Sequence, residues 1–296
     1  WKRFNPVRAS DRAYAAYLNR LRADVFDKMV GALGQDATEA ELRDIARYIN
    51  VASGRGDIGL KGSSDAGKAV ANAMPALAMG FWSPRNLASR VQFVTGVPLV
   101  QAAKNKATRK LIAKEYAKSI IATGALIGTA KLALESKQAK DAGIEGGVSG
   151  DITNSDFGKV RIGDTRIDMM AGAQQVAVLI GRLITGKATA PTSGKTTDLT
   201  TAYKAGPWDQ VMQFLKYKRN PVLSSAEEFY TGKNAVGADV SKGKAVANMF
   251  VPLSVMELYE GLTEEGVDKE DALILLNFFG ISTSRFSDKE KKADPR

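Results

Sequence analysis

The sequence predicts a mainly α-helical, multi-helix domain with one small β-hairpin insertion at about 158–168. Apolar residues recur at helical spacing along most of the chain, and helix start signals and glycines bracket these stretches. Alternation with a period of two residues occurs over one short stretch. With 296 residues, 44% of them hydrophobic, the chain is able to bury a sizeable core.

Two amphipathic helices are predicted first. Ser10 is the expected N-cap of one helix, which ends at Gly31 and Gly34. Its apolar residues share one stripe: Tyr14, Tyr17, Leu18, Leu21, Val25 and Met29. Thr38 and Glu41 form a capping box for the second helix, which ends near Gly54.

Three further helices are predicted before the hairpin. One covers about 65–74, and a second runs from Ser83-Pro84, a cap residue followed by proline, to about Val94. A long helical stretch then extends from about 98 to 135, with a kink expected near Gly124.

A β-hairpin and a polar linker are predicted in the middle of the chain, and the linker is the expected domain boundary. Lys159–Ile162 and Thr165–Asp168 alternate about a Gly163-Asp164 turn, which is a β-hairpin pattern. A helix at about 171–185 follows, and residues 187–200 are expected to be a polar linker or flexible loop. This linker would separate a helical region, 1–186, from a C-terminal helical region, 201–296, packed on the first.

The C-terminal region is predicted to hold four short helices and a charged, frayed tail. The helices cover about 207–219, 222–231, 252–263 and 269–279, and the tail runs from Ser284 to Arg296. The chain begins with Trp1 and has no signal-peptide pattern, and we expect it to be a processed product or a fragment of a longer polypeptide.

Composition excludes many kinds of active site. The chain has no Cys and no His, which rules out disulfides, thiolate or imidazole metal sites and the usual nucleophile–base pairs. No cofactor or metal is expected. Two patterns are weak: Gly54–Asp57 is typical of a helix stop with a solvated arginine, although its amides could face an anion, and Ser193–Thr196 lacks the first glycine of a phosphate-binding loop.

Acidic residues offer one enzymatic alternative. A run of carboxylates between Glu257 and Asp271 is typical of solvated helix ends or of a surface that docks a basic neighbour. Glycosidases use two carboxylates, so a carboxylate-based cell-wall hydrolase remains an alternative function.

The charge of the chain is typical of a protein with a polyanionic partner, and solvated lysine-rich faces would give the same total. The chain has 42 Lys and Arg against 32 Asp and Glu, a net charge of +10. Six basic residues gather within one helical stretch: Lys104, Lys106, Arg109, Lys110, Lys114 and Lys118. Lys106, Lys110 and Lys114 share a helix face that Lys118 continues, so they could follow a phosphate backbone or lie at lipid headgroups.

The uncharged stretch 119–130 is expected to be a buried core helix, with membrane contact as the alternative. It is shorter than the roughly 20 apolar residues that cross a bilayer. Gly124 and Gly128 form a GxxxG pattern, which predicts close helix–helix contact.

Six segments, in order along nearly the whole chain, resemble a domain of the large polyvalent proteins of bacteriophages. They are SDRAYAAYLNRLRADVFDKMV (10–30), IARYINVASGRGDIG (45–59), FWSPRNLASRVQF (81–93), DFGKVRIGDTRIDMMAG (156–172), QFLKYKRNPVLSSAEEFYTGKNAVGADV (213–240) and VPLSVMELYEGLTEEGVDKEDALILLNFFGIS (251–282). The resemblance implies a mainly helical, non-enzymatic domain near the C-terminal end of an internal virion or ejection protein, with no catalytic residues to carry over.

The resemblance also implies a location and partners. The protein would be packaged in the virion interior and reach the host periplasm, envelope or cytoplasm with the genome. Its expected partners are phage portal and core proteins and sister subunits in a homo-oligomer, with phage DNA and the host inner membrane as further candidates. The rival hypothesis is a nucleic-acid-binding module that acts on injected DNA through the basic residues at 104–118.

Overall fold

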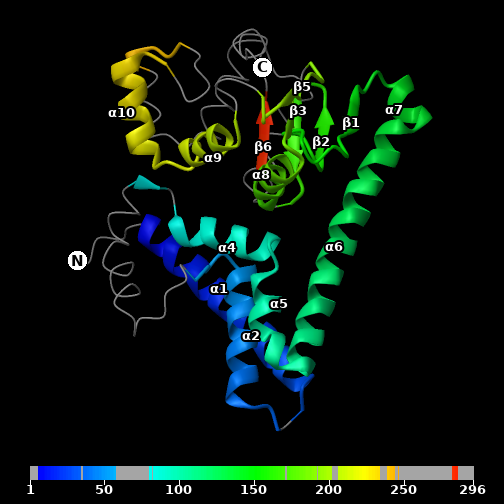
Figure 1. The fold of residues 1–296 in the computed structure, drawn as a ribbon, viewed down its shortest axis with the longest axis vertical. Helices are drawn as coiled ribbons and strands as arrows, with labels where there is room; N and C mark the ends of the chain where they lie inside the picture. The colour runs from blue at the N-terminus through cyan, green and yellow to red at the C-terminus, as the bar shows by residue number, and fades with distance from the viewer. Residues whose placement is uncertain are drawn as a thin grey trace. The chain divides into compact units, whose positions relative to one another are not determined.

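The computed structural model describes residues 6–34, 36–57, 80–81, 83–170, 172–191, 193–201, 206–233, 239–243, 246 and 282–285. It confirms a mainly α-helical fold with small antiparallel strands (Figure 1). The chain divides into two compact units, unit 1 (1–74 and 83–120) and unit 2 (75–82 and 121–296). The division falls at Ile120–Ile121, within α6, whereas the sequence analysis placed a linker at 187–200.

Several predicted features lie outside the described residues. They are the helices at 65–74, 252–263 and 269–279, the acidic run between Glu257 and Asp271, and the tail beyond Arg285.

Unit 1 is built from helices. They are α1 (Pro6–Gly31), α2 (Glu39–Ala52), α4 (Pro84–Val94), α5 (Val97–Gln101), the 3-10 turn η1 (Ala102–Lys104) and the first part of α6 (Lys106–Glu135). Helix α2 packs against α1, α4 and α5. Its predicted capping box is confirmed, because the Thr38 side chain accepts from the amide of Glu41 and the Glu41 carboxylate accepts from the amide of Thr38.

The core of unit 1 forms where α1, α2, η1 and α6 meet. Its buried residues are Met29, Ile45, Tyr48, Ile49, Ala102, Ile112 and Tyr116. The Tyr116 ring lies 4.7 Å from the Phe93 ring, centroid to centroid, and its hydroxyl donates to the Phe93 carbonyl at 3.1 Å. This core therefore anchors the first part of α6 to α2 and α4.

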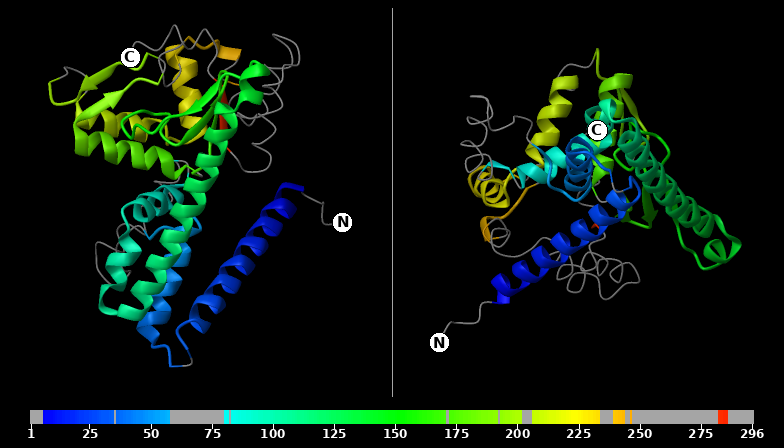
Figure 2. Two further views of the ribbon diagram at one scale, coloured as in Figure 1. Left: turned by 90° about the vertical axis from the view of Figure 1, so that its right-hand side faces the viewer. Right: turned by 90° about the horizontal axis from the view of Figure 1, so that it is seen from below.

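Helix α1 differs from the prediction at its N-terminal end. The helix begins at Pro6, so Ser10 lies inside it and is not the N-cap. Of the predicted apolar stripe, only Met29 is buried, whereas Tyr14 and Tyr17 are each 66% exposed. Figure 2 shows α1 diverging from α2 toward its N-terminus, so α2 does not cover this part of the stripe.

The long helical stretch breaks at Asn105 and not at Gly124. Helix α6 is continuous through Gly124, whereas Asn105 separates η1 from α6. The side-chain amide of Asn105 donates to the Asp44 carboxylate at 2.6 Å. The backbone carbonyl of Asn105 accepts a hydrogen bond from the Arg109 amide at 2.8 Å. A contact between residues 61 positions apart thus fixes the corner where α6 begins.

Unit 2 contains a four-stranded antiparallel sheet in the order β1-β2-β3-β6. The strands are β1 (Gly146–Val148), β2 (Lys159–Ile162), β3 (Thr165–Asp168) and β6 (Ser282–Arg285). The predicted hairpin is confirmed as β2–β3, with Gly163 at a φ of 54° in its turn. The predicted frayed tail is wrong at its start, because Ser282–Arg285 pairs with the free edge of β3.

Helices α7 (Lys137–Asp141), α8 (Ala173–Thr185), α9 (Pro207–Lys216) and α10 (Pro221–Thr231) complete the described part of unit 2. The predicted linker 187–200 instead contains a second hairpin, β4 (Lys187–Thr189) paired with β5 (Thr196–Asp198). Threonine is β-branched and favours strands. The Thr189 hydroxyl lies 2.7 Å from the Thr153 hydroxyl, which ties the hairpin to the loop before β2.

Candidate functional site

The six predicted basic residues are all exposed. Lys104 ends η1, and Lys106, Arg109, Lys110, Lys114 and Lys118 lie on the first part of α6. The opposite face of the same turns carries Thr108, Ile112 and Tyr116, which are buried in the core of unit 1. Because Lys106, Lys110, Lys114 and Lys118 recur every four residues, burial of that face directs them to solvent.

Most of these cations lack a carboxylate partner. Lys118 donates to Glu115 at 2.5 Å, one turn away on the same helix. Within the part of the chain that the structure describes, no ion pair involves Lys104, Lys106, Arg109, Lys110 or Lys114. We call these six exposed residues the basic stripe, and five of its six cations form no ion pair among the described residues.

The second part of α6 is apolar and exposed, which contradicts the expectation of a core helix at 119–130. Ile120 and Ile121 are 69% and 70% exposed, and Leu132 is 71% exposed. Only one side of this part contacts other residues of unit 2: Leu134 reaches Gly146 on β1, and Ile127 reaches Gly158. The sheet thus covers one side, and we call the exposed residues Ile121 and Leu132, which lie within about 20° of each other around the helix axis, the apolar face.

The length and composition of α6 as a whole also bear on membrane contact. Among the described residues α6 is the one helix long and apolar enough to cross a membrane, by length and composition alone, and its most apolar stretch is not buried. Its continuous uncharged run, Ser119–Ala130, spans about 18 Å, against about 30 Å for a bilayer core. This length fits insertion into one leaflet better than a complete crossing.

Gly124 and Gly128 lie on this exposed part of α6. A β-carbon built on either glycine would meet nothing within 4 Å. The predicted helix–helix contact is therefore not made by the described residues of a single chain. Both glycines leave the backbone open to close approach by a helix from another molecule.

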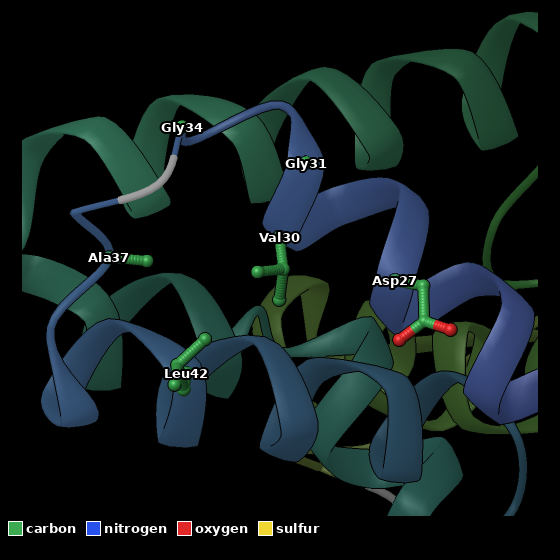
Figure 3. Close-up of a pocket in the computed structure, with 6 residues that line it drawn as sticks. All are labelled: Asp27, Val30, Gly31, Gly34, Ala37 and Leu42. Carbon is green, nitrogen blue, oxygen red and sulfur yellow. The ribbon is translucent and has the colours of Figure 1, made fainter.

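One hollow among the described residues lies apart from α6. A hollow of about 590 Å³ lies between α1 and α2, where Val30 and Leu42 face each other (Figure 3). Its lining has one charged side chain among the described residues, Asp27. In the described ranges, no three Asp or Glu residues gather as they would around a metal ion.

The basic stripe could be found from sequence, whereas the apolar face could not. Spacing alone shows that Ile121 and Leu132 are apolar, but it does not show which side of α6 the rest of the chain covers. No family model, no curated protein and no solved structure matches this chain. The function must therefore be argued from α6 and the composition.

Proposed function

We propose that this chain is a non-enzymatic interaction domain of a bacteriophage internal virion protein, packaged in the capsid and delivered into the host with the genome. In this role α6 inserts shallowly into an anionic host membrane. Copies of the chain then assemble with one another and with portal or core proteins. The observation that carries the proposal is the juxtaposition, on one helix, of the basic stripe and the apolar face.

The basic part of α6 suits the charged headgroup region of an anionic membrane, and its apolar part suits the acyl chains beneath. Lysines near an anionic leaflet each contribute about 1 kcal/mol of attraction. An exposed Ile or Leu side chain gains about 1.5–3 kcal/mol when it is buried in an apolar phase. Several residues of each kind are exposed on α6, so charge attraction and apolar burial both favour attachment of the domain to an anionic membrane.

Assembly of sister subunits is supported by the open edge at Gly124 and Gly128. Small residues at this spacing let two helix backbones approach closely, and such contacts persist in lipid. An α6 that has entered a leaflet would present this edge to the α6 of a neighbouring copy.

A nucleic-acid-binding role is the second candidate, and the exposed cations of the basic stripe favour it. Four lysines at intervals of four residues on one exposed face could neutralise successive phosphates. This role leaves the apolar face without a use. Binding to DNA would fall steeply with salt, whereas membrane binding would keep an apolar component that salt does not weaken.

The first test measures flotation of the whole chain with vesicles of phosphatidylglycerol and, separately, of phosphatidylcholine. We expect binding to the anionic vesicles only. The double variant Ile121→Asp, Leu132→Asp should lose about a hundredfold in affinity, because two apolar side chains no longer enter lipid. The double variant Ile184→Asp, Val222→Asp is the matched control, since it adds the same two charges and both residues are exposed and lie outside α6, at 79% and 55%.

Two outcomes would contradict membrane insertion. One is equal binding by the α6 double variant and the control. The other is wild-type binding that disappears completely at high salt, which would favour the nucleic-acid role. Circular dichroism of each variant shows whether the helical fold is retained.

The virion location is tested on the parent phage particle by electron cryomicroscopy before and after genome release. We expect density for this chain inside the capsid before release and at the host envelope afterwards. A particle that lacks the chain would contradict packaging and would make the nucleic-acid-binding role the leading proposal.

A further inference from the structure

A polar hollow of about 460 Å³ opens in unit 1, and none of its described lining residues belongs to the basic stripe. It forms around the end of α2, the turn that follows α2, and the first turn of α4. Among the described residues, its lining includes Arg47, Asn50, Val51, Arg55, Asp57, Arg85 and Gln101. Three arginines and one aspartate are among these, so the described part of the lining carries an excess of positive charge.

Backbone contacts hold two of these arginines in place. The amide of Gly56 donates to the carbonyl of Arg85 at 3.0 Å, which joins the residue after Arg55 directly to Arg85. A β-carbon on Gly56 would lie 2.2 Å from the Ser89 nitrogen, so the turn approaches α4 as closely as only glycine permits. The two guanidinium groups therefore extend from a fixed turn and a helix.

A fourth arginine forms hydrogen bonds to the start of this turn. Arg22 on α1 donates through Nε to the Ser53 hydroxyl at 2.7 Å and through a terminal nitrogen to the Ser53 carbonyl at 2.9 Å. Burial, and then the charge of Arg55, lower the pKa of Arg22. Like charges are thus held near one another around this turn.

Among the described residues, no acidic side chain forms an ion pair with Arg55 or Arg85. Asp44 lies 3.5 Å from Arg47 and compensates that arginine. Asp57 lines the hollow, and the side chain of Gln92 bonds its backbone amide and carbonyl.

We propose that this hollow binds the phosphate groups of a small, soluble phosphate compound, with Arg55 and Arg85 as the principal ligands. Guanidinium groups bind phosphate through paired N–H donors, and arginine is the residue best suited to this geometry. The amide side chains of Asn50 and Gln101 add neutral donors to the same lining. A concave site of this volume is of the size that takes a small molecule.

Isothermal titration calorimetry of the whole chain with inorganic pyrophosphate tests the proposal. Arg55→Gln and Arg85→Gln should each weaken binding by about tenfold or more, because each removes charge-assisted hydrogen bonds. Arg90→Gln is the matched control. It removes the same charge from the same helix as Arg85 but lies outside the hollow, and we expect it to bind as the wild type does.

Several results would overturn the proposal. They are absence of pyrophosphate binding by the wild-type chain, unchanged binding by Arg55→Gln and Arg85→Gln, and equal weakening by Arg90→Gln, which would indicate non-specific attraction. Loss of duplex DNA or vesicle binding in the two variants, without pyrophosphate binding by the wild type, would assign the arginines to a polymer or a membrane instead. The α6 double variant should bind pyrophosphate normally, so failure of the membrane role leaves this test intact.

Discussion

Asp156 and Arg166 form a buried ion pair in unit 2. The Oδ2 atom of Asp156 lies 3.2 Å from the Nε atom of Arg166, and the two side chains are 11% and 3% exposed. Lys159 lies 3.5 Å from the other oxygen of the same carboxylate. One aspartate in the loop before β2 therefore neutralises a cation on each strand of the β2–β3 hairpin.

Asp156→Ala should lower the free energy of unfolding of unit 2 by about 3–5 kcal/mol. The cost arises because the substitution removes the buried carboxylate that pairs with the buried guanidinium of Arg166. Hydrogen exchange of the β2 and β3 amides, measured alongside urea unfolding, reports this loss for the unit itself.

Glu135→Gln is the control for this prediction. It removes a carboxylate from the Lys131–Glu135 pair, whose atoms are 3.8 Å apart and whose side chains are more than half exposed. Such a pair contributes about 1 kcal/mol or less. Equal destabilisation by the two variants would mean that the burial of Asp156 has no energetic consequence.

Gly56→Ala should destabilise unit 1 by about 1–3 kcal/mol, since the added methyl group overlaps the backbone of α4. Gly31→Ala is the comparison, because a β-carbon there meets nothing within 4 Å and alanine favours the helix. Thermal unfolding measures the stability of both variants. A Gly56→Ala chain as stable as the Gly31→Ala chain would show that the turn moves away from α4 at no cost.

Features that depend on neighbouring residues could be predicted from the sequence. The capping box at Thr38–Glu41 and the hairpin about Gly163-Asp164 each bring together residues only a few positions apart. Their partners are in the local sequence, so the local pattern is sufficient.

Features that depend on distant partners could not be predicted. Ser282–Arg285 looks like part of a charged tail until the free edge of β3 is known. Asn105 ends a helix through a bond to Asp44, which no local pattern indicates. Periodicity likewise places Ile121 and Leu132 on a helix, but only the fold shows that no other element covers them.

Tyr48 should make the stability of unit 1 depend on pH in alkaline solution. Burial, with a smaller effect from Glu115, raises the pKa of Tyr48 to about 12 from an unfolded value near 10. The folded state favours the neutral phenol, so this contribution is complete below pH 10 and is lost as the pH rises toward 12. We expect the free energy of unfolding to fall by up to about 3 kcal/mol across that interval.

Denaturant unfolding at a series of pH values checks this dependence. Tyr48→Phe should flatten the profile between about pH 10 and 12, because phenylalanine has no proton to lose. Tyr230→Phe serves as the control, since Tyr230 is 87% exposed. A profile that is unchanged by Tyr48→Phe would contradict the assigned role of this tyrosine.

Reversing the charge of the basic stripe should weaken binding to anionic vesicles while leaving the fold intact. Lys106, Lys110 and Lys114 are exposed and make no ion pair in the described part of the chain, so replacing all three with Glu removes no contact. The loss of attraction should amount to about 1 kcal/mol or more for each position. Vesicle flotation at low salt measures it.

The net charge of the chain must be held equal to show that the stripe itself is responsible. Lys187, Lys195 and Lys233 are also exposed, and their replacement with Glu lowers the net charge by the same amount, from +10 to +4. We expect this second triple variant to retain most of its vesicle binding, because its charges lie outside α6. Equal losses in the two variants would mean that total charge, and not the arrangement on α6, draws the domain to a membrane.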